Sequence, residues 1–234
     1  MRKKPMLAYP VSDKPIDYTD KVFIQPKLDG VRCVIQAEKK FVTESRKHHG
    51  TARIFKTVVT AYSRTGKVWK NIDHILQNLE PFFVEHPDVI LDGELYNHDF
   101  KDDFESIISM VRKTKPTAED RVISAKNVQF HCYDIVDEKL PFKQRIEFIH
   151  NSLMLLGDSI KTVYTMRVSS HENALTFHES FKAGGYEGSI LRSNNKYQCK
   201  RSHALRKFKD FSDAEATIIG YLDGKGKRTG TLGK

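Results

Sequence analysis

The first 210 residues of the chain alternate short runs rich in β-branched and aromatic residues with stretches in which apolar residues recur at helical spacing. Alternation of this kind predicts a mixed domain of strands and helices. The strand-like runs are residues 22–26, 31–37, 58–62, 89–92, 128–135 and 188–192. A turn over residues 28–30 predicts a hairpin between the first two runs, and hairpins join antiparallel strands. We therefore expect an α+β fold of mainly antiparallel sheets with flanking helices, not a doubly wound parallel sheet.

Four stretches predict amphipathic helices, because their apolar residues fall on one face. These stretches are residues 71–78, 104–111, 142–156 and 174–181, the last of which precedes the pair Gly184-Gly185. Asn71 is expected to cap the first helix. Core packing accounts for the aromatic residues of these helices without any cofactor.

The pattern changes after residue 211. A strand is expected over residues 214–221, followed by a glycine-rich basic segment from Asp223 to Gly230. The residues from 212 to 234 offer room for only one or two strands, which cannot bury a core. We expect one domain over residues 1–211 and the incomplete start of a second over residues 212–234.

The charge balance favours a polyanionic partner but does not decide one. Lysine and arginine outnumber aspartate and glutamate by 39 to 30, which gives a formal net charge of +9 and an isoelectric point near 9.3. The three cysteines lie far apart, so neither a disulfide framework nor a zinc site is indicated. No apolar run has the length of a signal peptide or membrane span, so we expect a cytoplasmic protein without a membrane partner.

The segment Gln25-Pro-Lys-Leu-Asp-Gly-Val-Arg32 places a lysine at a strand end, with an arginine close behind. In a cleft lined with cations, an amine loses proton affinity and becomes a nucleophile for phosphorus. Lys27 is the candidate nucleophile, and Arg32 is spaced to reach the same cleft and bond to sugar or phosphate. Taken alone, the segment is also compatible with an ordinary hairpin carrying solvated charges, although the catalytic interpretation is favoured.

The segment resembles the first motif of the covalent nucleotidyltransferases, which comprise DNA ligases, RNA ligases and mRNA capping enzymes. Five more segments resemble the motifs of ATP-dependent DNA ligases, in the same order: Ser63-Arg-Thr-Gly66, Leu91-Asp-Gly-Glu-Leu95, Phe130-His-Cys-Tyr-Asp134, Glu187-Gly-Ser-Ile-Leu-Arg192 and Leu205-Arg-Lys-Phe-Lys209. The resemblance covers residues 20–234. It implies the ATP-grasp-like nucleotidyltransferase fold of DNA ligases over residues 1–211, followed by the start of an oligonucleotide-binding (OB) fold over residues 212–234.

The resemblance also implies a role for each matched residue. Lys27 takes up AMP, Arg64 meets phosphate and Glu94 contacts ribose. Tyr133 stacks on adenine, Glu187 helps to place a metal ion, and two lysines of the last motif grip phosphate. The expected ATP- and AMP-binding residues are Gln25, Lys27, Arg32, Arg64, Glu94, Tyr133, Glu187, Lys207 and Lys209. The expected metal ligands, for Mg²⁺ or Mn²⁺, are Glu94 and Glu187.

Elementary chemistry is compatible with these roles. Strand carboxylates suit a hard divalent ion, and the alternate residues Lys207 and Lys209 would project from one strand face into one site. The resemblance implies that Lys27 attacks the α-phosphorus of ATP, that AMP passes to a DNA 5′-phosphate, and that a 3′-hydroxyl then displaces it. The expected protein is a monomeric ATP-dependent DNA ligase that seals nicked duplex DNA in the cytoplasm, or in the host cytoplasm if its source is viral.

Other functions remain open at this point. An RNA ligase is the nearest alternative, followed by a capping guanylyltransferase, and a catalytically silent nucleic-acid-binding module is the alternative outside the enzymes. Two departures from the family pattern matter. Gln25 stands where relatives commonly have an acidic residue, and the basic sixth motif, which orients pyrophosphate, does not fall within the sequence, so slow self-adenylation is expected. The ten histidines show no metal-ligand spacing, and Arg46-Lys-His-His49 is interpreted as a loop tip.

Overall fold

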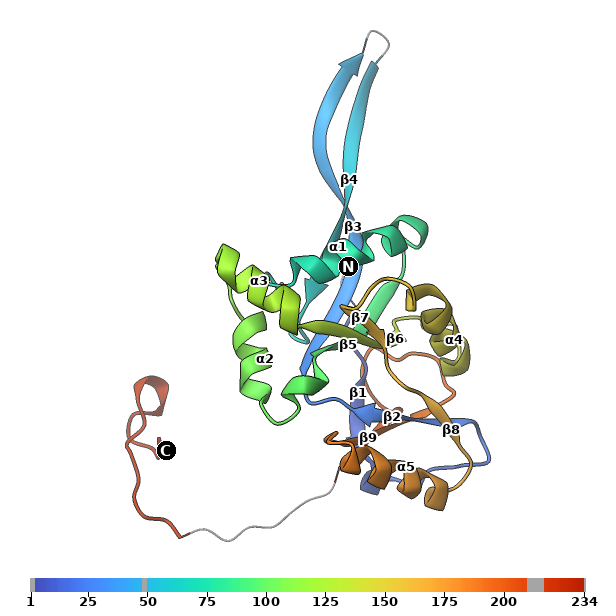
Figure 1. Ribbon diagram of the computed structural model, residues 1–234, viewed down its shortest axis with the longest axis vertical. Helices are drawn as coiled ribbons and strands as arrows, with labels where there is room; N and C mark the ends of the chain where they lie inside the picture. Colours follow the sequence, from blue (N-terminus) through green and yellow to red (C-terminus); the bar gives the residue numbers. More distant parts are fainter. Residues whose placement is uncertain (1–2, 48–49, 210–216, 234) are drawn as a thin grey trace.

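The computed structural model describes residues 3–47, 50–209 and 217–233, which contain two five-stranded sheets (Figure 1). Sheet A has the strand order β1 (Leu7–Pro10), β10 (Arg201–Phe208), β9 (Gly188–Ser193), β2 (Val22–Lys27) and β8 (Met166–Val168). Sheet B has the order β4 (Gly50–Tyr62), β3 (Val31–Lys47), β5 (Ile90–Tyr96), β6 (Gln129–Ile135) and β7 (Ile160–Thr162). Neighbouring strands are antiparallel except β1 with β10 and β6 with β7. The predicted α+β class with mainly antiparallel sheets is confirmed.

The helices cover the outer parts of the sheets. The largest core packs sheet B against helices that include α1 (Asp73–Glu85) and α4 (Phe142–Leu153), and a smaller core packs sheet A against α5 (His171–Ala183). The remaining helices are α2 (Phe104–Val111), α3 (Ala118–Asn127), and the short 3₁₀ turns η1 (Val11–Asp13), η2 (His98–Phe100) and η3 (Gly226–Arg228). Each fully buried aliphatic or aromatic side chain contributes roughly 1.5–3 kcal/mol to stability.

Strand alternation leaves polar residues between the two sheets. On β5, Leu91 and Leu95 enter the large core, and the intervening residues Asp92 and Glu94 point the other way. On β2, Ile24 belongs to the core beneath α5, so Gln25 lies on the opposite face. The two-residue period of each strand thus separates a hydrophobic face from a face that carries the motif residues.

The hairpin predicted at residues 28–30 is wrong. β2 pairs with β8 and β9, whereas β3 pairs with β4 and β5, so these residues cross from sheet A to sheet B. Gly30 is required for close approach rather than for an unusual turn, because a Cβ there would lie 2.4 Å from the carbonyl oxygen of Leu95 and 2.8 Å from Cγ of Glu94. The crossing places the end of β2 next to the start of β3, at the junction of the sheets.

The helix predictions hold in part. α2 spans the predicted residues 104–111 and α5 contains 174–181, while α4 ends at Leu153 rather than at residue 156. α1 runs over Asp73–Glu85, and Ile72 occupies its N-cap position. Asn71 is not the cap, because its side-chain amide donates to the carbonyl oxygens of Met110 and Asp120, at 2.9 and 3.2 Å. α3 was not predicted, although Thr117 and Asp120 form a capping box at its start.

Two predicted strands are much longer than expected. β3 continues to Lys47 and β4 begins at Gly50, so residues for which no element was predicted form a ribbon that projects from the body of the molecule (Figure 1). Of the predicted loop tip, Arg46 and Lys47 belong to β3. His48 and His49 lie outside the described residues. The predicted strand 214–221 lies partly outside them too, and residues 217–221 of it form no strand. Among the described residues, no helix has the length and apolarity needed to cross a membrane.

Candidate active site

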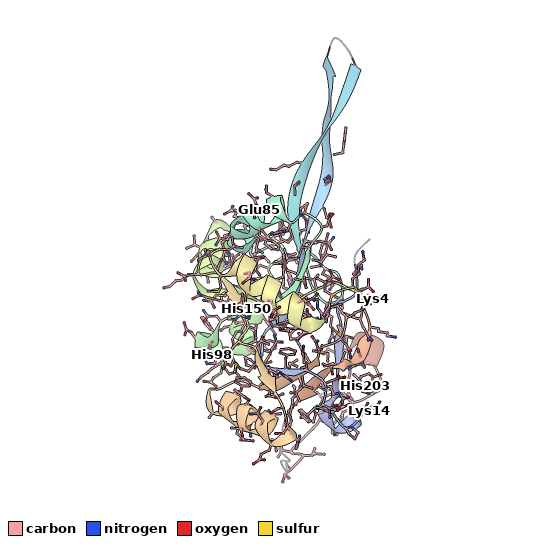
Figure 2. All side chains as sticks on the ribbon, turned by 90° about the vertical axis from the view of Figure 1, so that its right-hand side faces the viewer. Lys4, Lys14, Glu85, His98, His150 and His203 are labelled. Atoms are coloured by element: carbon pink, nitrogen blue, oxygen red, sulfur yellow. The ribbon has the colours of Figure 1, made fainter. Side chains whose placement is uncertain are left out.

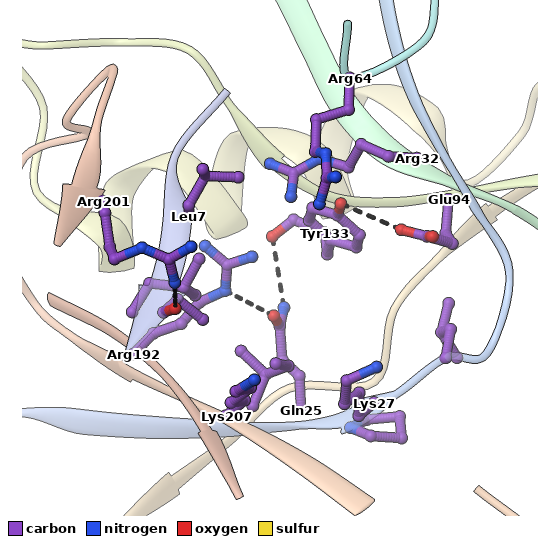
Figure 3. A pocket seen from close by; sticks show the side chains of 15 residues that line it. Leu7, Gln25, Lys27, Arg32, Arg64, Glu94, Tyr133, Arg192, Arg201 and Lys207 are labelled. Carbon is purple, nitrogen blue, oxygen red and sulfur yellow. Dashed lines mark hydrogen bonds between the residues drawn. The ribbon is translucent and has the colours of Figure 1, made fainter. Parts of the chain in front are cut away.

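A cavity of about 300 Å³ lies between the two sheets (Figure 3). Sheet A contributes lining residues from β1, β2, β9 and β10, and sheet B contributes them from β3, β5 and β6. Seven of the predicted site residues line it, namely Gln25, Lys27, Arg32, Arg64, Glu94, Tyr133 and Lys207. The sheets therefore bring together residues that are up to 182 positions apart in the chain.

Lys27 is the last residue of β2 and forms an ion pair with Glu187, which immediately precedes β9. Only 21% of the Lys27 side chain is exposed. Burial lowers the pKa of Lys27, although the nearby carboxylates of Glu94 and Asp29 act in the opposite direction. A lysine with a lowered pKa has a larger share of free amine, which is the form that can attack an electrophile.

Glu187 is shared between two lysines. Its Oε2 accepts from Lys27, and its Oε1 accepts from Lys209, which follows the end of β10. Burial lowers the pKa of Lys209, and the positive charge of Lys27 lowers it further. Lys207 lines the cavity itself, whereas Lys209 contacts Glu187. Lys207 and Lys209 therefore meet the site at different points rather than as one pair.

Glu94, on β5, accepts a hydrogen bond from the hydroxyl of Tyr133 on β6, at 3.2 Å (Figure 3). Burial raises the pKa of Glu94 to about 7, even though Arg32 and Lys27 favour its charged form. The guanidinium carbons of Arg32 and Arg192 each lie 5.2 Å from the centre of the Tyr133 ring, within cation–π range. The ring that was predicted to stack on adenine is therefore fixed at the cavity wall by neighbouring groups.

Arg32 is held by Asp92, a residue to which the sequence analysis assigned no role. Nε and Nη2 of Arg32 donate to the two carboxylate oxygens of Asp92, at 2.6 and 2.5 Å, and Nη2 also donates to the carbonyl oxygen of Met6. Asp92 is only 1% exposed and also accepts from the hydroxyl of Tyr197, at 2.7 Å. This bidentate pair fixes the direction of Arg32 and leaves part of its guanidinium facing the cavity.

Gln25 is oriented by Arg192. Nε of Arg192 donates to Oε1 of Gln25 at 2.6 Å, while the Gln25 amide nitrogen donates to the hydroxyl of Thr165 at 2.8 Å and to the carbonyl oxygen of Tyr133 at 3.3 Å. Because a guanidinium can only donate, the amide cannot turn over without losing this bond. One lone pair of Oε1 remains able to accept a hydrogen bond from a ligand.

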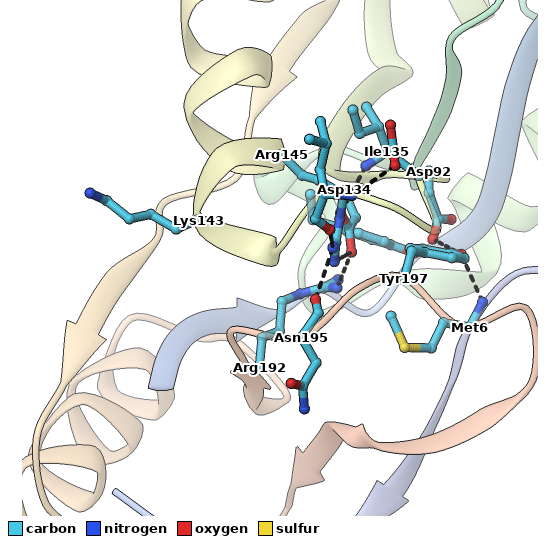
Figure 4. Close-up of polar contacts among 12 residues, drawn as sticks. Met6, Asp92, Asp134, Ile135, Lys143, Arg145, Arg192, Asn195 and Tyr197 are labelled. Atoms are coloured by element: carbon cyan, nitrogen blue, oxygen red, sulfur yellow. Dashed lines mark hydrogen bonds and ion pairs between the residues drawn. The ribbon is translucent and has the colours of Figure 1, made fainter. Parts of the chain in front are cut away.

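A buried charge network supports the floor of the site (Figure 4). Asp134 is fully buried and accepts from Arg145 at 2.7 and 3.1 Å and from Arg192 at 2.6 Å. Charged residues within the apolar strands β6 and β9 were a visible sequence signal of such a network. Their partners could not be assigned, because the paired residues are 11 and 58 positions apart.

A second cavity of about 700 Å³ shares Arg32, Arg64 and Glu94 with the first. Its other lining residues include Lys67, Arg112 and Lys113, which the sequence analysis did not single out. The two cavities together present cations along a continuous path, which suits an extended polyanion. Among the described residues, no group of three or more His, Cys, Asp or Glu side chains could hold a metal ion by itself.

Comparisons with solved structures find the same fold in other proteins. The solved structure Pmar-Lig_PreS3 has 22% sequence identity and a TM-score of 0.69, and the similarity covers 99% of this chain and 52% of that one, so this chain spans about half of its length. A Lig E DNA ligase has 23% identity and a TM-score of 0.69, with 100% and 78% of the two chains covered. The ATP-dependent DNA ligase of bacteriophage T7, solved with ATP, has 18% identity and a TM-score of 0.67, with 98% and 76% covered.

These structures establish the fold alone, because sequence identities of 18–23% are too low to transfer a function. A comparison of the sequence with curated proteins gives no match. The family model described as the ATP dependent DNA ligase domain matches residues 5–209, which include all the residues of the two cavities. This chain therefore belongs to the family of ATP-dependent DNA ligase domains.

Proposed function

We propose that this chain is the nucleotidyltransferase part of an ATP-dependent DNA ligase that seals nicks in duplex DNA. Lys27 Nζ attacks the α-phosphorus of ATP, the bond to the β-phosphate oxygen breaks, and pyrophosphate leaves with its electron pair. The resulting lysyl-AMP passes AMP to a DNA 5′-phosphate, which regenerates the lysine. A 3′-hydroxyl then attacks that 5′-phosphate, and AMP leaves as the phosphodiester forms.

The observation that carries this proposal is the position of Lys27. Its amine lies at a cavity lined by Arg32, Arg64 and Lys207, and burial lowers its pKa. Displacements at phosphorus depend mainly on positioning and on neutralising negative charge, so a nucleophilic amine among fixed cations is the required combination. An ordinary surface lysine would have neither feature.

We assign the base and sugar of ATP to the Tyr133 side of the cavity. The ring of Tyr133 offers a stacking surface, and the free lone pair of Gln25 Oε1 can accept from the exocyclic amino group of adenine. Guanine presents a carbonyl oxygen at the corresponding position, which would face another acceptor. The orientation imposed by Arg192 therefore favours ATP over GTP even though Gln25 replaces the acidic residue common in relatives.

We propose Glu94 and Glu187 as the carboxylates that hold Mg²⁺, or Mn²⁺. Two carboxylates suit Mg²⁺, which usually takes one or two from the protein and completes its shell with water and substrate phosphates. Both carboxylates act on Lys27, one through a direct ion pair and the other through its charge. When bound, the ion would supply positive charge at the phosphates.

The larger cavity is the proposed path of the DNA strand next to the nick. Arg64, Arg112 and Lys113 would contact phosphates there, which requires no particular base sequence. The proposal also includes an adenylation domain over residues 1–211, the start of an OB fold over residues 212–234, and action as a monomer in the cytoplasm or, for a viral source, the host cytoplasm.

Nick sealing tests the proposal. A labelled duplex with a 5′-phosphate at the nick should be joined when ATP and Mg²⁺ are present, while a duplex with a 5′-hydroxyl at the nick should not. A parallel substrate with an RNA strand at the nick separates DNA joining from RNA joining. Failure to join any of them, together with failure to take up AMP, would support a silent binding module instead.

A further inference from the structure

β3 and β4 form a two-stranded ribbon that leaves the body of the domain. β3 pairs with β5 from Val31 to Gln36, while its pairing with β4 continues outward to Lys47 and Gly50. Figures 1 and 2 show this ribbon extending well beyond the helices. We call residues 37–47 and 50–58 the arm. At about 3.3 Å per residue, the β3 side of the arm reaches about 35 Å.

The arm is more basic than the rest of the chain. The segment 37–58 contains Lys39, Lys40, Arg46, Lys47, Arg53 and Lys56, against Glu38 and Glu44. It therefore carries a net charge of +4 out of the chain's +9, in less than a tenth of its residues. Such a concentration of charge on a projecting element fits a polyanion.

Repulsion between lysines at the base of the arm lowers the stability of the ribbon. Lys39, Lys40 and Lys56 are exposed. Lys40 and Lys56 are direct cross-strand partners in the register, and like charges at such positions destabilise a strand pair. A ribbon without a third strand is only marginally stable in water. A partner that supplies negative charge would relieve the repulsion and stabilise the ribbon.

The arm is also continuous with the active site, because both include residues of β3. Arg32, the second residue of β3, lines the cavity, and Lys40 lies eight residues further along the same strand. That separation is about 26 Å, which equals roughly seven or eight base pairs of B-form DNA at 3.4 Å each. A two-stranded ribbon is also narrow enough to enter or follow a DNA groove.

We propose that the arm binds the phosphate backbone of duplex DNA about seven or eight base pairs from the nick. The inference rests on the proposed function, because sealing a nick is what places the duplex at the cavity. Lysine side chains contact phosphates without reading bases, so this contact adds affinity and fixes the direction of the duplex rather than selecting a sequence.

The test compares two variants with equal charge loss. K39Q/K40Q/K56Q removes three lysines from the arm, and K126Q/K139Q/K143Q removes three exposed lysines elsewhere. On a nicked duplex with 16 base pairs on each side of the nick, the arm variant should bind about tenfold more weakly, and its salt dependence should fall by about 2 to 3 in log–log slope. The control should stay within about twofold of wild type.

The length of duplex on each side of the nick shows where the arm contacts the DNA. When the duplex on the arm's side of the nick is cut to about five base pairs and closed by a loop, wild type and the arm variant should bind equally, because the DNA no longer reaches Lys40. Shortening the other flank should preserve the difference. K39R/K40R/K56R should bind like wild type on every duplex, since arginine keeps the charge.

Two results would overturn the inference: equal losses in the arm and control variants, or an arm variant that binds the long duplex as tightly as wild type. AMP attachment from ATP, measured without DNA, should be unchanged in the arm variant. If wild type takes up no AMP, the proposed function fails. The comparison of DNA affinities still decides whether the arm binds a duplex.

Discussion

Lys27 and Glu187 form an ion pair at the junction of the two sheets, and Lys209 binds the second oxygen of the same carboxylate. The ion pair with Glu187 favours the ammonium form of Lys27, whereas burial lowers the pKa of Lys27 and opposes that form. When Lys27 becomes an uncharged nucleophile, Lys209 still neutralises Glu187. The carboxylate therefore does not become an unpaired charge when the amine is consumed.

Glu187→Gln should move the pH dependence of AMP attachment to lower pH. Removing the carboxylate takes away the ion-pair partner of the ammonium, so the pKa of Lys27 should fall further. The measurement is the initial rate of AMP attachment between pH 6 and 9. The maximal rate should also fall if Glu187 holds the metal ion. Glu179→Gln, an exposed change on α5, is the matched control, and an unchanged or upward-shifted profile for Glu187→Gln would contradict the assignment.

Glu94→Gln should make the ligand-free protein more stable at high pH. The pKa of Glu94 in the folded protein is about 7, above its ordinary value of 4.5. The folded state therefore holds the proton more tightly, and the resulting stability is lost as pH rises from about 4.5 through 7. The variant should gain about 1–3 kcal/mol over wild type at pH 8 and little at pH 4, measured by urea unfolding.

Tyr133→Phe tests whether the Tyr133 hydroxyl lowers the pKa of Glu94. It keeps the ring but removes the hydroxyl that favours ionised Glu94. The pKa of Glu94 should rise further, so this variant should lose stability relative to wild type at pH 8, opposite in sign to Glu94→Gln. Equal responses of the two variants at pH 8 would mean that the hydroxyl does not act through Glu94.

Asp134→Asn should be the most destabilising single change of a polar residue near the site. The substitution leaves the guanidinium groups of Arg145 and Arg192 buried without a counter-charge, at a cost of about 3–5 kcal/mol. Asp158→Asn, which alters an exposed pair with Lys161, should change stability by less than about 1 kcal/mol. Similar urea midpoints for the two variants would show that Asp134 is not the charge that holds the network together.

The sequence predicted which residues share the cavity better than it predicted how the chain brings them together. Lys27 and Arg32 meet as expected, but across two sheets rather than along one hairpin, because a glycine-containing turn looks the same in both arrangements. Gly30 is needed for its close approach to β5, a requirement that depends on the position of Leu95. Local patterns cannot contain that information.

The arm was not predicted because its sequence lacks a strand pattern, whereas the buried network was not predicted because its visible charges could not be paired. The apolar residues near Lys40 and Lys56 come in adjacent pairs, Phe41-Val42 and Ile54-Phe55, so the segments lack the alternation that marks a half-buried strand. Their structure comes from pairing with each other. Asp134 and Arg192 stand out as charges in apolar strands, but only the three-dimensional fold reveals that they pair. The roles assigned to the site residues remain predictions for the measurements above.

The most direct test of the central claim is attachment of AMP to Lys27. Wild type, Lys27→Ala, Lys27→Arg and the surface control Lys14→Ala should be incubated with α-labelled ATP and Mg²⁺, denatured, and digested for mass spectrometry. We expect label that resists denaturant in wild type and Lys14→Ala, on the peptide that contains Lys27, and none in the other two variants. Lys27→Arg should fail because a guanidinium stays protonated and offers no lone pair. Undiminished labelling of either Lys27 variant, or AMP on a different residue of wild type, would contradict this account.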